Sequence, residues 1–397
     1  MYDFAVVGGG PAGSHAAAVL AAKGHSVLVL EERAGPGEKG SCTGIVSAEC
    51  LQHFPQLHAA AIREFQSARV YSPSGQELRV HRSTPQAYLL DRALADAVLA
   101  QEACRAGAEY VYRAKVESII PGDDCMRLGV DGLRAHEVEA QAVVLACGFS
   151  PRLTAALGFG RIQDWALGAQ ARVEMSDVPE VELYLGRDVA PGFFAWVVPS
   201  GPGAGLVGLF SRDLPSVHLE ALLKSLRERG VVRRTRQISH GVIPLRPLRH
   251  TYGHRLLALG DAAGQVKPTS GGGIYFGLIA SKLAAETLHE AALLGDFSQR
   301  VLRRYEQRWK RRLLRELRIG YAARKVFETF DDSEMEEIFR VVSSNGIHHD
   351  LLHSQEFGFD WHARLILKAA RHHMLGTLLK RGTAALFAQE AANQPPG

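Results

Sequence analysis

Cysteines are few in this chain, and they are scattered. Its 397 residues include five cysteines, which are Cys42, Cys50, Cys104, Cys125 and Cys147. No two of them form a Cys-x-x-Cys motif. Their odd number and irregular spacing argue against a disulfide framework and against a zinc site, so we expect no metal centre. A reducing cytoplasm is the compartment that fits this cysteine usage.

Long apolar runs and a strong net charge are also lacking. No run of about 18 apolar residues exists that could span a bilayer. The N-terminus leads directly into an apolar stretch at residues 4–7 without a preceding basic segment, so we expect no signal peptide. A net charge of +4 is too small to indicate nucleic-acid binding. The hydrophobic content of 46% is enough for a large core, and the length of 397 residues suggests two or more domains.

The N-terminal segment has the pattern of a βαβ unit. Apolar strands are predicted over Tyr2–Val7 and Ser26–Glu31, and an alanine-rich helix over Pro11–Lys23 lies between them. This order of elements implies a parallel sheet. Glu31 ends the second strand, where a carboxylate can accept hydrogen bonds from ribose hydroxyls.

The turn between the first strand and the helix carries a glycine motif. Gly8, Gly10 and Gly13 satisfy the pattern Gly-x-Gly-x-x-Gly. The first glycine permits a tight turn, the second lets a pyrophosphate approach the backbone, and the third lets the helix pack closely on the strand. The free N–H groups of the helix N-terminus favour phosphate there.

A second glycine-rich segment follows much later. Gly260–Gly264 comes after a buried strand predicted over Leu256–Leu259, and Pro268–Ile274 opens a long helix. Asp261 at the strand end can bind ribityl hydroxyls. Backbone N–H groups at the helix start can face the N1 and C2 carbonyl of a flavin.

The remaining pattern completes the expected elements. We predict a hairpin over Ala68–Val80, a helix over Asp91–Ala106 and a strand over Ala142–Ala146. The stretch Gly168–Pro244 alternates short apolar strands with Gly and Pro turns, and predicts a separate β layer. From Phe297 onward the chain is helical and basic.

In their order, these blocks resemble the FAD-binding family typified by p-hydroxybenzoate hydroxylase. The resemblance implies that FAD is the tightly held cofactor, with Arg92 near its phosphates and Val116 at the adenine edge. Cys147 departs from the family, where Asp is common. The expected cofactor-binding residues are Gly8, Gly10, Ala12, Gly13, Glu31, Cys42, Thr43, Gly44, Arg92, Val116, Gly148, Asp261, Gly271, Gly272, Gly273 and Ile274.

Two further segments resemble the geranylgeranyl reductase family within this fold. Ser41–Ile45 is similar to its Cys-x-(x)-Gly-(Ile/Leu) element, and Pro191–Pro199 to its Tyr-x-Trp-x-Phe-Pro motif, with Phe194 in place of Tyr and Val198 in place of Phe. The resemblance covers about residues 1–300. It implies an α/β fold with a Rossmann-type FAD-binding domain, an inserted mostly β substrate domain and a C-terminal helical region. The FAD-binding domain is expected to be discontinuous and to comprise residues 1–67, 88–165 and 252–298. The β-rich substrate domain would comprise residues 68–87 and 166–251, and the helical region residues 299–397.

This resemblance implies an FAD-dependent reductase of isoprenoid carbon–carbon double bonds in a lipid, a quinone or a chlorophyll-type substrate. Phe194, Trp196 and Pro199 are the expected substrate contacts, and Phe193, Phe194 and Trp196 would form an apolar wall. We expect the prenyl chain to enter between the β layer and the helices after Phe297. Saturating such a bond needs a hydride and a proton. Cys42 is the candidate catalytic residue, as the proton donor or as part of the pocket wall.

Other functions remain open at the level of sequence. No second Rossmann motif for NADPH occurs, so either NADPH or a reduced electron carrier could reduce the flavin. A flavin monooxygenase of an apolar or aromatic substrate would share the whole FAD site. A flavin-dependent halogenase would need a lysine, and the stretch Arg69–Arg92 contains none. A flavoprotein that only binds a lipid or a partner is the non-enzymatic alternative.

The C-terminal helices are basic. Val301–Phe327 contains ten Lys or Arg residues and an apolar stripe at every fourth position from Tyr305 to Tyr321, and Trp361–Lys380 repeats the theme. Such helices could lie on the anionic cytoplasmic face of a membrane, or could pack on the flavin domain with a solvated basic face. We interpret five histidines as surface or packing residues: His348, His349, His353, His372 and His373.

Overall fold

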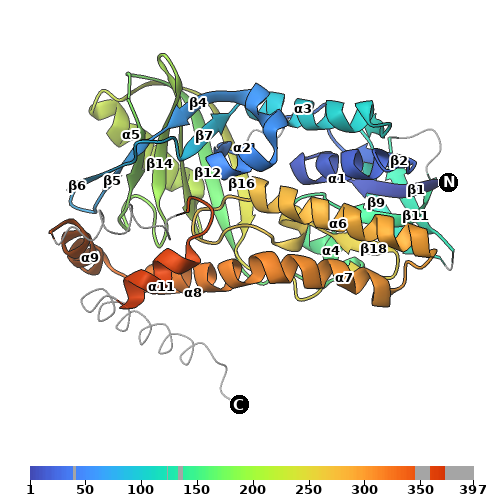
Figure 1. Ribbon diagram of the computed structural model, residues 1–397. Coiled ribbons are helices and arrows are strands. Elements are labelled where there is room, and N and C mark those ends of the chain that lie inside the picture. The colour runs from blue at the N-terminus through green and yellow to red at the C-terminus, as the bar shows by residue number, and fades with distance from the viewer. Residues whose placement is uncertain (39–41, 123, 133–136, 345–357, 372–397) are drawn as a thin grey trace.

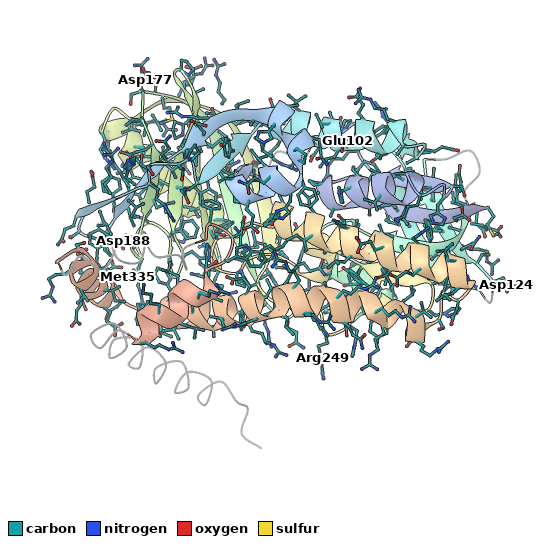
Figure 2. The ribbon with its side chains drawn as sticks, in the orientation of Figure 1. Glu102, Asp124, Asp177, Asp188, Arg249 and Met335 are labelled. Carbon is teal, nitrogen blue, oxygen red and sulfur yellow. The ribbon has the colours of Figure 1, made fainter. Side chains whose placement is uncertain are left out.

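The structure, a computed structural model, describes residues 1–38, 42–122, 124–132, 137–344 and 358–371. It is a mixed α/β fold in which an eight-stranded sheet and a seven-stranded sheet lie side by side (Figure 1). Asp124, between β9 and β10, and Asp177, after β12, mark opposite ends of the molecule (Figure 2).

The eight-stranded sheet is built around the predicted βαβ unit. β1 (Tyr2–Val7) pairs in parallel with β2 (Val27–Glu31) and with β11 (Glu137–Leu145), and α1 (Pro11–Ala21) connects the first two. β18 (Leu256–Ala258) pairs in parallel with β11, as predicted for a buried strand. The other strands are β8 (Glu109–Tyr112), β9 (Lys115–Pro121), β10 (Met126–Asp131) and β17 (Tyr252–Gly253).

Strand alternation divides the core around this sheet into two layers. Phe4 and Val6 of β1 face α1, α3 (Arg92–Arg105) and α6 (Ile274–Leu294). Ala5 and Val7 face the opposite side, which β9 and β10 cover. Both faces of the central strands are therefore buried, as a parallel sheet requires.

The seven-stranded sheet has the order β16-β12-β15-β14-β13-β5-β6. The predicted hairpin supplies β5 (Ser67–Tyr71) and β6 (Glu77–His81). The remaining strands are β12 (Trp165–Met175), β13 (Val181–Tyr184), β14 (Ala195–Gly201), β15 (Ala204–Ser211) and β16 (Val232–Pro244).

The mostly β layer expected over Gly168–Pro244 contains one helix, α5 (Pro215–Glu228), between its strands. Leu219, Leu222, Leu223 and Leu226 recur at helical spacing and are buried against one face of the sheet. The opposite face of the sheet carries Trp196, Val198 and Phe210 and packs against Phe65 and Leu89.

Short elements connect these layers. A three-stranded sheet contains β3 (Ile45–Ser47), β7 (Ala87–Leu90) and β4 (Ala61–Phe65). The short helices are α2 (Ala48–His53), η1 (Pro55–Ala60), α4 (Pro151–Ala156) and η2 (Gly260–Ala263).

The C-terminal region is helical, as predicted. α7 (Gln299–Trp309), the π-helical turn η3 (Lys310–Leu314) and α8 (Arg315–Thr329) form one long rod along the lower edge of the molecule in Figure 1. α9 (Asp332–Ser344) and α11 (Ala363–Arg371) follow. The part of the predicted basic helix after Arg371 and the five C-terminal histidines named above lie outside the described residues.

The apolar stripe of the rod is packed against protein. Tyr305, Trp309, Leu313 and Leu317 are almost completely buried in the core that they share with α6. This stripe is therefore occupied by protein contacts and is not available for insertion into a membrane. Within the described residues, no helix is long and apolar enough to cross a membrane, and no group of His, Cys, Asp and Glu could hold a metal ion.

Candidate active site

A cavity of about 1100 Å³ lies between the two larger sheets. Its walls are the β1–α1 turn, the loop after β2, the start of α3, the inner face of the seven-stranded sheet and the segment before α6. One end of the cavity is rich in glycine and polar groups, and the wall formed by the seven-stranded sheet is aromatic and apolar.

The three glycines of the β1–α1 turn have different surroundings. A Cβ on Gly8, whose φ is +103°, would lie 2.5 Å from the carbonyl oxygen of Ala146, and one on Gly13 would lie 2.0 Å from that of Gly8. These two positions are closed by the protein itself. A Cβ on Gly10 would meet no atom within 4 Å and would project into the cavity. Gly13 does not line the cavity, and its role is to let α1 approach β1.

Glu31 is fixed at the same end of the cavity. Its Oε2 accepts a hydrogen bond of 2.7 Å from the backbone N–H of Gly9, and its Oε1 accepts one of 3.0 Å from Arg33. The carboxylate is buried and lines the cavity. The Glu31 carboxylate is therefore held in the cavity, where the sequence analysis expects an acceptor for ribose hydroxyls.

Arg92 contributes a buried cation with spare donors. Its Nη2 donates to Asp96 at 2.8 Å, but Nε and Nη1 are buried without a hydrogen-bond partner among the described residues. Burial lowers the pKa of Arg92, yet the neighbouring Cys42, Asp96 and Asp261 outweigh it and leave the pKa raised. A buried guanidinium with unpaired donors on a cavity wall fits an anionic ligand such as a phosphate.

The segment before α6 forms the facing wall. Gly271, Gly272, Gly273 and Ile274 all line the cavity, together with Asp261. The Oγ of Ser270 is buried here without a hydrogen-bond partner among the described residues, as are two donors of Arg92, and a bound ligand would supply the missing partners. The backbone N–H groups at this helix start favour a partial negative charge. With Gly10 and Arg92, this donor set fits FAD.

Only two of the three predicted substrate residues lie on the aromatic wall of the cavity. Phe194 and Trp196 line the cavity, and Phe210 lies 4.8 Å from Trp196 between ring centroids. Pro199 is buried but does not line the cavity, and Phe193 belongs to the core on the opposite face, with the Arg324 guanidinium 3.5 Å from its ring centroid. Neighbours in an extended chain point to opposite faces, which separates Phe193 from Phe194 and Pro199 from Trp196.

Cys42 lies on the cavity wall beside these groups. Thr43, Gly44, Ala12, Val116 and Gly148 line the same cavity. The Thr43 hydroxyl donates a hydrogen bond of 2.6 Å to Oε1 of Gln170 on β12. This hydrogen bond joins the loop that carries Cys42 to the seven-stranded sheet, whose inner face forms the aromatic wall.

The residues that cover the cavity on the C-terminal side differ from those predicted. Among the described residues after 298, only Phe359 and His362 line the cavity, because the apolar side of α7 and α8 is occupied by α6. His362 shares a hydrogen bond of 2.6 Å with the Thr269 hydroxyl. Burial, and then the charge of Lys267, lower the pKa of His362 to about 4, so the ring is neutral at neutral pH.

Lys267 is a cavity residue that the sequence analysis missed. Its ammonium is buried and pairs with Asp360, and it lies 5.1 Å from the ring centroid of Phe359. Its position directly before the Pro268–Ile274 motif was a usable signal, as was the polar Gln170 in an otherwise small and apolar strand. No local signal could have brought His362 to this site, because it comes from a distant C-terminal segment.

The chain is similar to known proteins over most of its length. The family model described as lycopene cyclase protein matches residues 3–353. A digeranylgeranylglycerophospholipid reductase of Methanocaldococcus jannaschii is 30% identical over 364 residues, which are 87% of this chain and 91% of that protein.

Two solved structures share the fold. A geranylgeranyl bacteriochlorophyll reductase-like protein of Thermoplasma acidophilum has a TM-score of 0.83 and 23% identity, over 96% of this chain and 98% of that one. Halogenase PltM, in complex with phloroglucinol and FAD, has a TM-score of 0.68 and 16% identity, over 99% of this chain and 93% of that one.

Proposed function

The chain belongs to the geranylgeranyl reductase family of FAD-dependent oxidoreductases, and from that premise we propose that it reduces isoprenoid carbon–carbon double bonds. A prenyl chain of a lipid, a quinone or a chlorophyll-type molecule is the substrate class. The relative from Methanocaldococcus jannaschii is named for a digeranylgeranylglycerophospholipid, and a lipid carrying such chains is the first candidate.

One observation carries this proposal: the phosphate-binding end and the aromatic wall belong to one cavity. Trp196, Phe194 and Phe210 form a continuous aromatic cluster on that wall. A prenyl chain has no polar handle, so a protein holds it by contact area and shape. This wall provides such contact beside the residues that fit FAD.

The residues then divide the chemistry. Bound FAD, once reduced, supplies the hydride that saturates the alkene. Arg92 and the Gly10 turn hold the pyrophosphate, Glu31 the ribose, and Asp261 the ribityl chain. Cys42 lies on the wall beside Arg92 and is the proposed source of the proton. Residues 1–67, 88–165 and 252–298 form the FAD-binding domain in this proposal.

The electron donor belongs to the proposal as NADPH or a reduced electron carrier. A monooxygenase is the second candidate, since it would use the same FAD residues. A halogenase has less support. The lysine that lines the cavity at position 267 is paired with Asp360, and the likeness to halogenase PltM at 16% identity concerns the fold alone.

We also propose a peripheral contact with the cytoplasmic face of an anionic membrane. Four cationic side chains surround a groove between α8 and α11: Arg315, Arg364, Lys368 and Arg371. No ion pair joins any of them to an acidic residue within the described part of the chain. The buried apolar stripe limits this contact to charge attraction, and a groove lined with cations fits anionic headgroups.

An anaerobic experiment tests the proposed reaction. Purified protein should release FAD on heating. With the bound flavin reduced under argon, a geranylgeranyl lipid should reoxidise it and leave a product with two more hydrogens for each bond reduced. Reoxidation that requires oxygen and a compact aromatic substrate would establish the hydroxylase instead.

A further inference from the structure

The residue at the junction between the Cys42 loop and the aromatic wall is Gln170. It is buried on β12 and lines the cavity, and its side chain is in contact with groups from both regions. Its Oε1 accepts the hydrogen bond from Thr43 at 2.6 Å and one from the indole Nε1 of Trp196 at 3.4 Å. Thr43 follows Cys42 directly, so one atom connects the loop of the proposed proton donor to the proposed substrate wall.

The strand register explains how Trp196 reaches Gln170 from two strands away. Gly208 on β15 pairs with Gln170 on one side and with Trp196 on the other. A Cβ on Gly208 would lie 2.5 Å from Cζ2 of the indole. Because glycine has no side chain, the indole can lie across β15 and direct its N–H toward β12. Gly208 is therefore required for this contact.

Hydrogen-bond chemistry fixes the orientation of the amide. An indole N–H can only donate, so it must face an acceptor, which here is Oε1 of Gln170. The Thr43 hydroxyl donates to the same oxygen. The amide nitrogen then points away from these two donors.

We infer that Gln170 is a positioning residue that sets the distance between Cys42 and the substrate chain by holding the Cys42–Thr43 loop and the Trp196 indole on one carbonyl oxygen. The inference rests on the proposed function, because Cys42 delivers a proton and Trp196 bears the prenyl chain in that proposal. Proton transfer to an alkene carbon depends steeply on distance, and a displacement of about 1 Å can lower a rate on the order of 100-fold.

The test compares two substitutions of the same residue in the FAD-loaded enzyme. Gln170→Met keeps the length of the side chain and removes the acceptor, whereas Gln170→Glu keeps an accepting oxygen and removes the amide N–H groups. We expect Gln170→Met to lower kcat about 10- to 100-fold with a smaller change in KM. Gln170→Glu should recover most of that loss. Trp196→Ala, by contrast, should act mainly by raising KM.

A second measurement does not depend on turnover. Alkylation of Cys42 by iodoacetamide, followed by peptide-resolved mass spectrometry, reports how firmly its loop is held. Gln170→Met should increase the alkylation rate several-fold, and Gln170→Glu should restore it. Thr43→Val removes the other half of the hydrogen bond and should have the same effect, with no further increase in the double variant. Gln237→Met, at an exposed position on β16, is the matched control, and its Cys42 alkylation rate should equal that of the unsubstituted protein.

Two results would overturn the inference. In the first, Gln170→Met keeps kcat and the Cys42 alkylation rate within about twofold, which is below the expected effect of misplacement. In the second, Gln170→Glu is as defective as Gln170→Met, which assigns the role to the amide nitrogen. If no prenyl substrate is reduced by the unsubstituted enzyme, the proposed function has failed, and the alkylation rates alone still decide the role of Gln170.

Discussion

The three glycines of the β1–α1 turn look equivalent in the sequence motif but occupy unlike environments. Gly13 is required by the protein, since a Cβ there would lie 2.0 Å from the Gly8 carbonyl oxygen. Gly10 is required by the ligand, since its missing side chain leaves space in the cavity. The backbone at Gly10, with φ −72°, is one that alanine adopts freely.

This difference predicts opposite effects of two identical substitutions. Gly13→Ala should destabilise the FAD-free protein by about 1–3 kcal/mol, because α1 must move away from β1. Gly10→Ala should cost at most about 1 kcal/mol through its weaker N-cap, yet lower FAD affinity more than tenfold. Urea unfolding of FAD-free protein and FAD titration separate the two. Equal destabilisation by both substitutions would contradict this account of the turn.

At the scale of elements, the C-terminal segment 358–371 is fixed to the site by several polar contacts. The Glu316 carboxylate accepts the backbone N–H groups of His362 and Ala363 at the start of α11. The Trp361 indole donates to Glu49 at 2.7 Å, and Asp360 pairs with Lys267. The segment therefore closes the cavity through bonds to elements distant in sequence.

The neutral state of His362 predicts how this segment responds to pH. Its pKa in the folded protein is about 4, below the unfolded value near 6.5, so the unfolded state binds the extra proton first. The contribution is complete above pH 6.5 and is lost as the pH falls toward 4, by up to about 3 kcal/mol. Hydrogen exchange should show amides of 358–371 losing protection over this range.

Two histidine variants provide the control for this prediction. His362→Gln should remove most of the pH dependence of exchange in 358–371. His15, buried beside Ser281 between α1 and α6, also has a pKa of about 4 from burial. His15→Gln should alter global unfolding between pH 6.5 and 4 and leave local opening of 358–371 unchanged. If both variants behave alike there, His362 does not control the segment.

The sequence predicted those elements whose signals are local. The βαβ unit, the hairpin at 68–80 and α3 follow from periodicity and turn residues over short stretches, and the structure contains them. It could not assign Phe193 and Pro199 correctly, because the face of a strand that meets a cavity depends on its neighbours. The partners of Gln170 were also beyond it, since they depend on strand register.

At the scale of the whole molecule, the candidate site is the cavity between the two larger sheets. The rod formed by α7, η3 and α8 runs along the lower edge of the molecule (Figure 1). Its apolar side is buried against α6, while the residues that face outward include Arg311, Arg315 and Arg318. The basic groove between α8 and α11 lies next to the segment that closes the cavity. In the proposed peripheral contact, a lipid substrate would reach the cavity from the anionic membrane surface.

This arrangement predicts weak, salt-sensitive binding to anionic vesicles. Attraction of about 1 kcal/mol per well-placed cation should give measurable sedimentation with phosphatidylserine vesicles at low salt and little at 0.5 M salt. Charge reversal at Lys368 and Arg371 should abolish it, while the same changes at Arg233 and Arg234 on exposed β16 should not. Binding that persists at high salt would point to apolar insertion and contradict the packed rod.

The most direct test of the central claim follows the atoms in a single turnover. Enzyme carrying reduced FAD is mixed with a geranylgeranyl lipid under argon and, separately, under ¹⁸O₂, and the product masses are measured. The account predicts that the product under argon gains two hydrogens for each double bond reduced and that neither product contains ¹⁸O. A product that forms only under ¹⁸O₂ and carries the label would show an oxygenase and contradict the account.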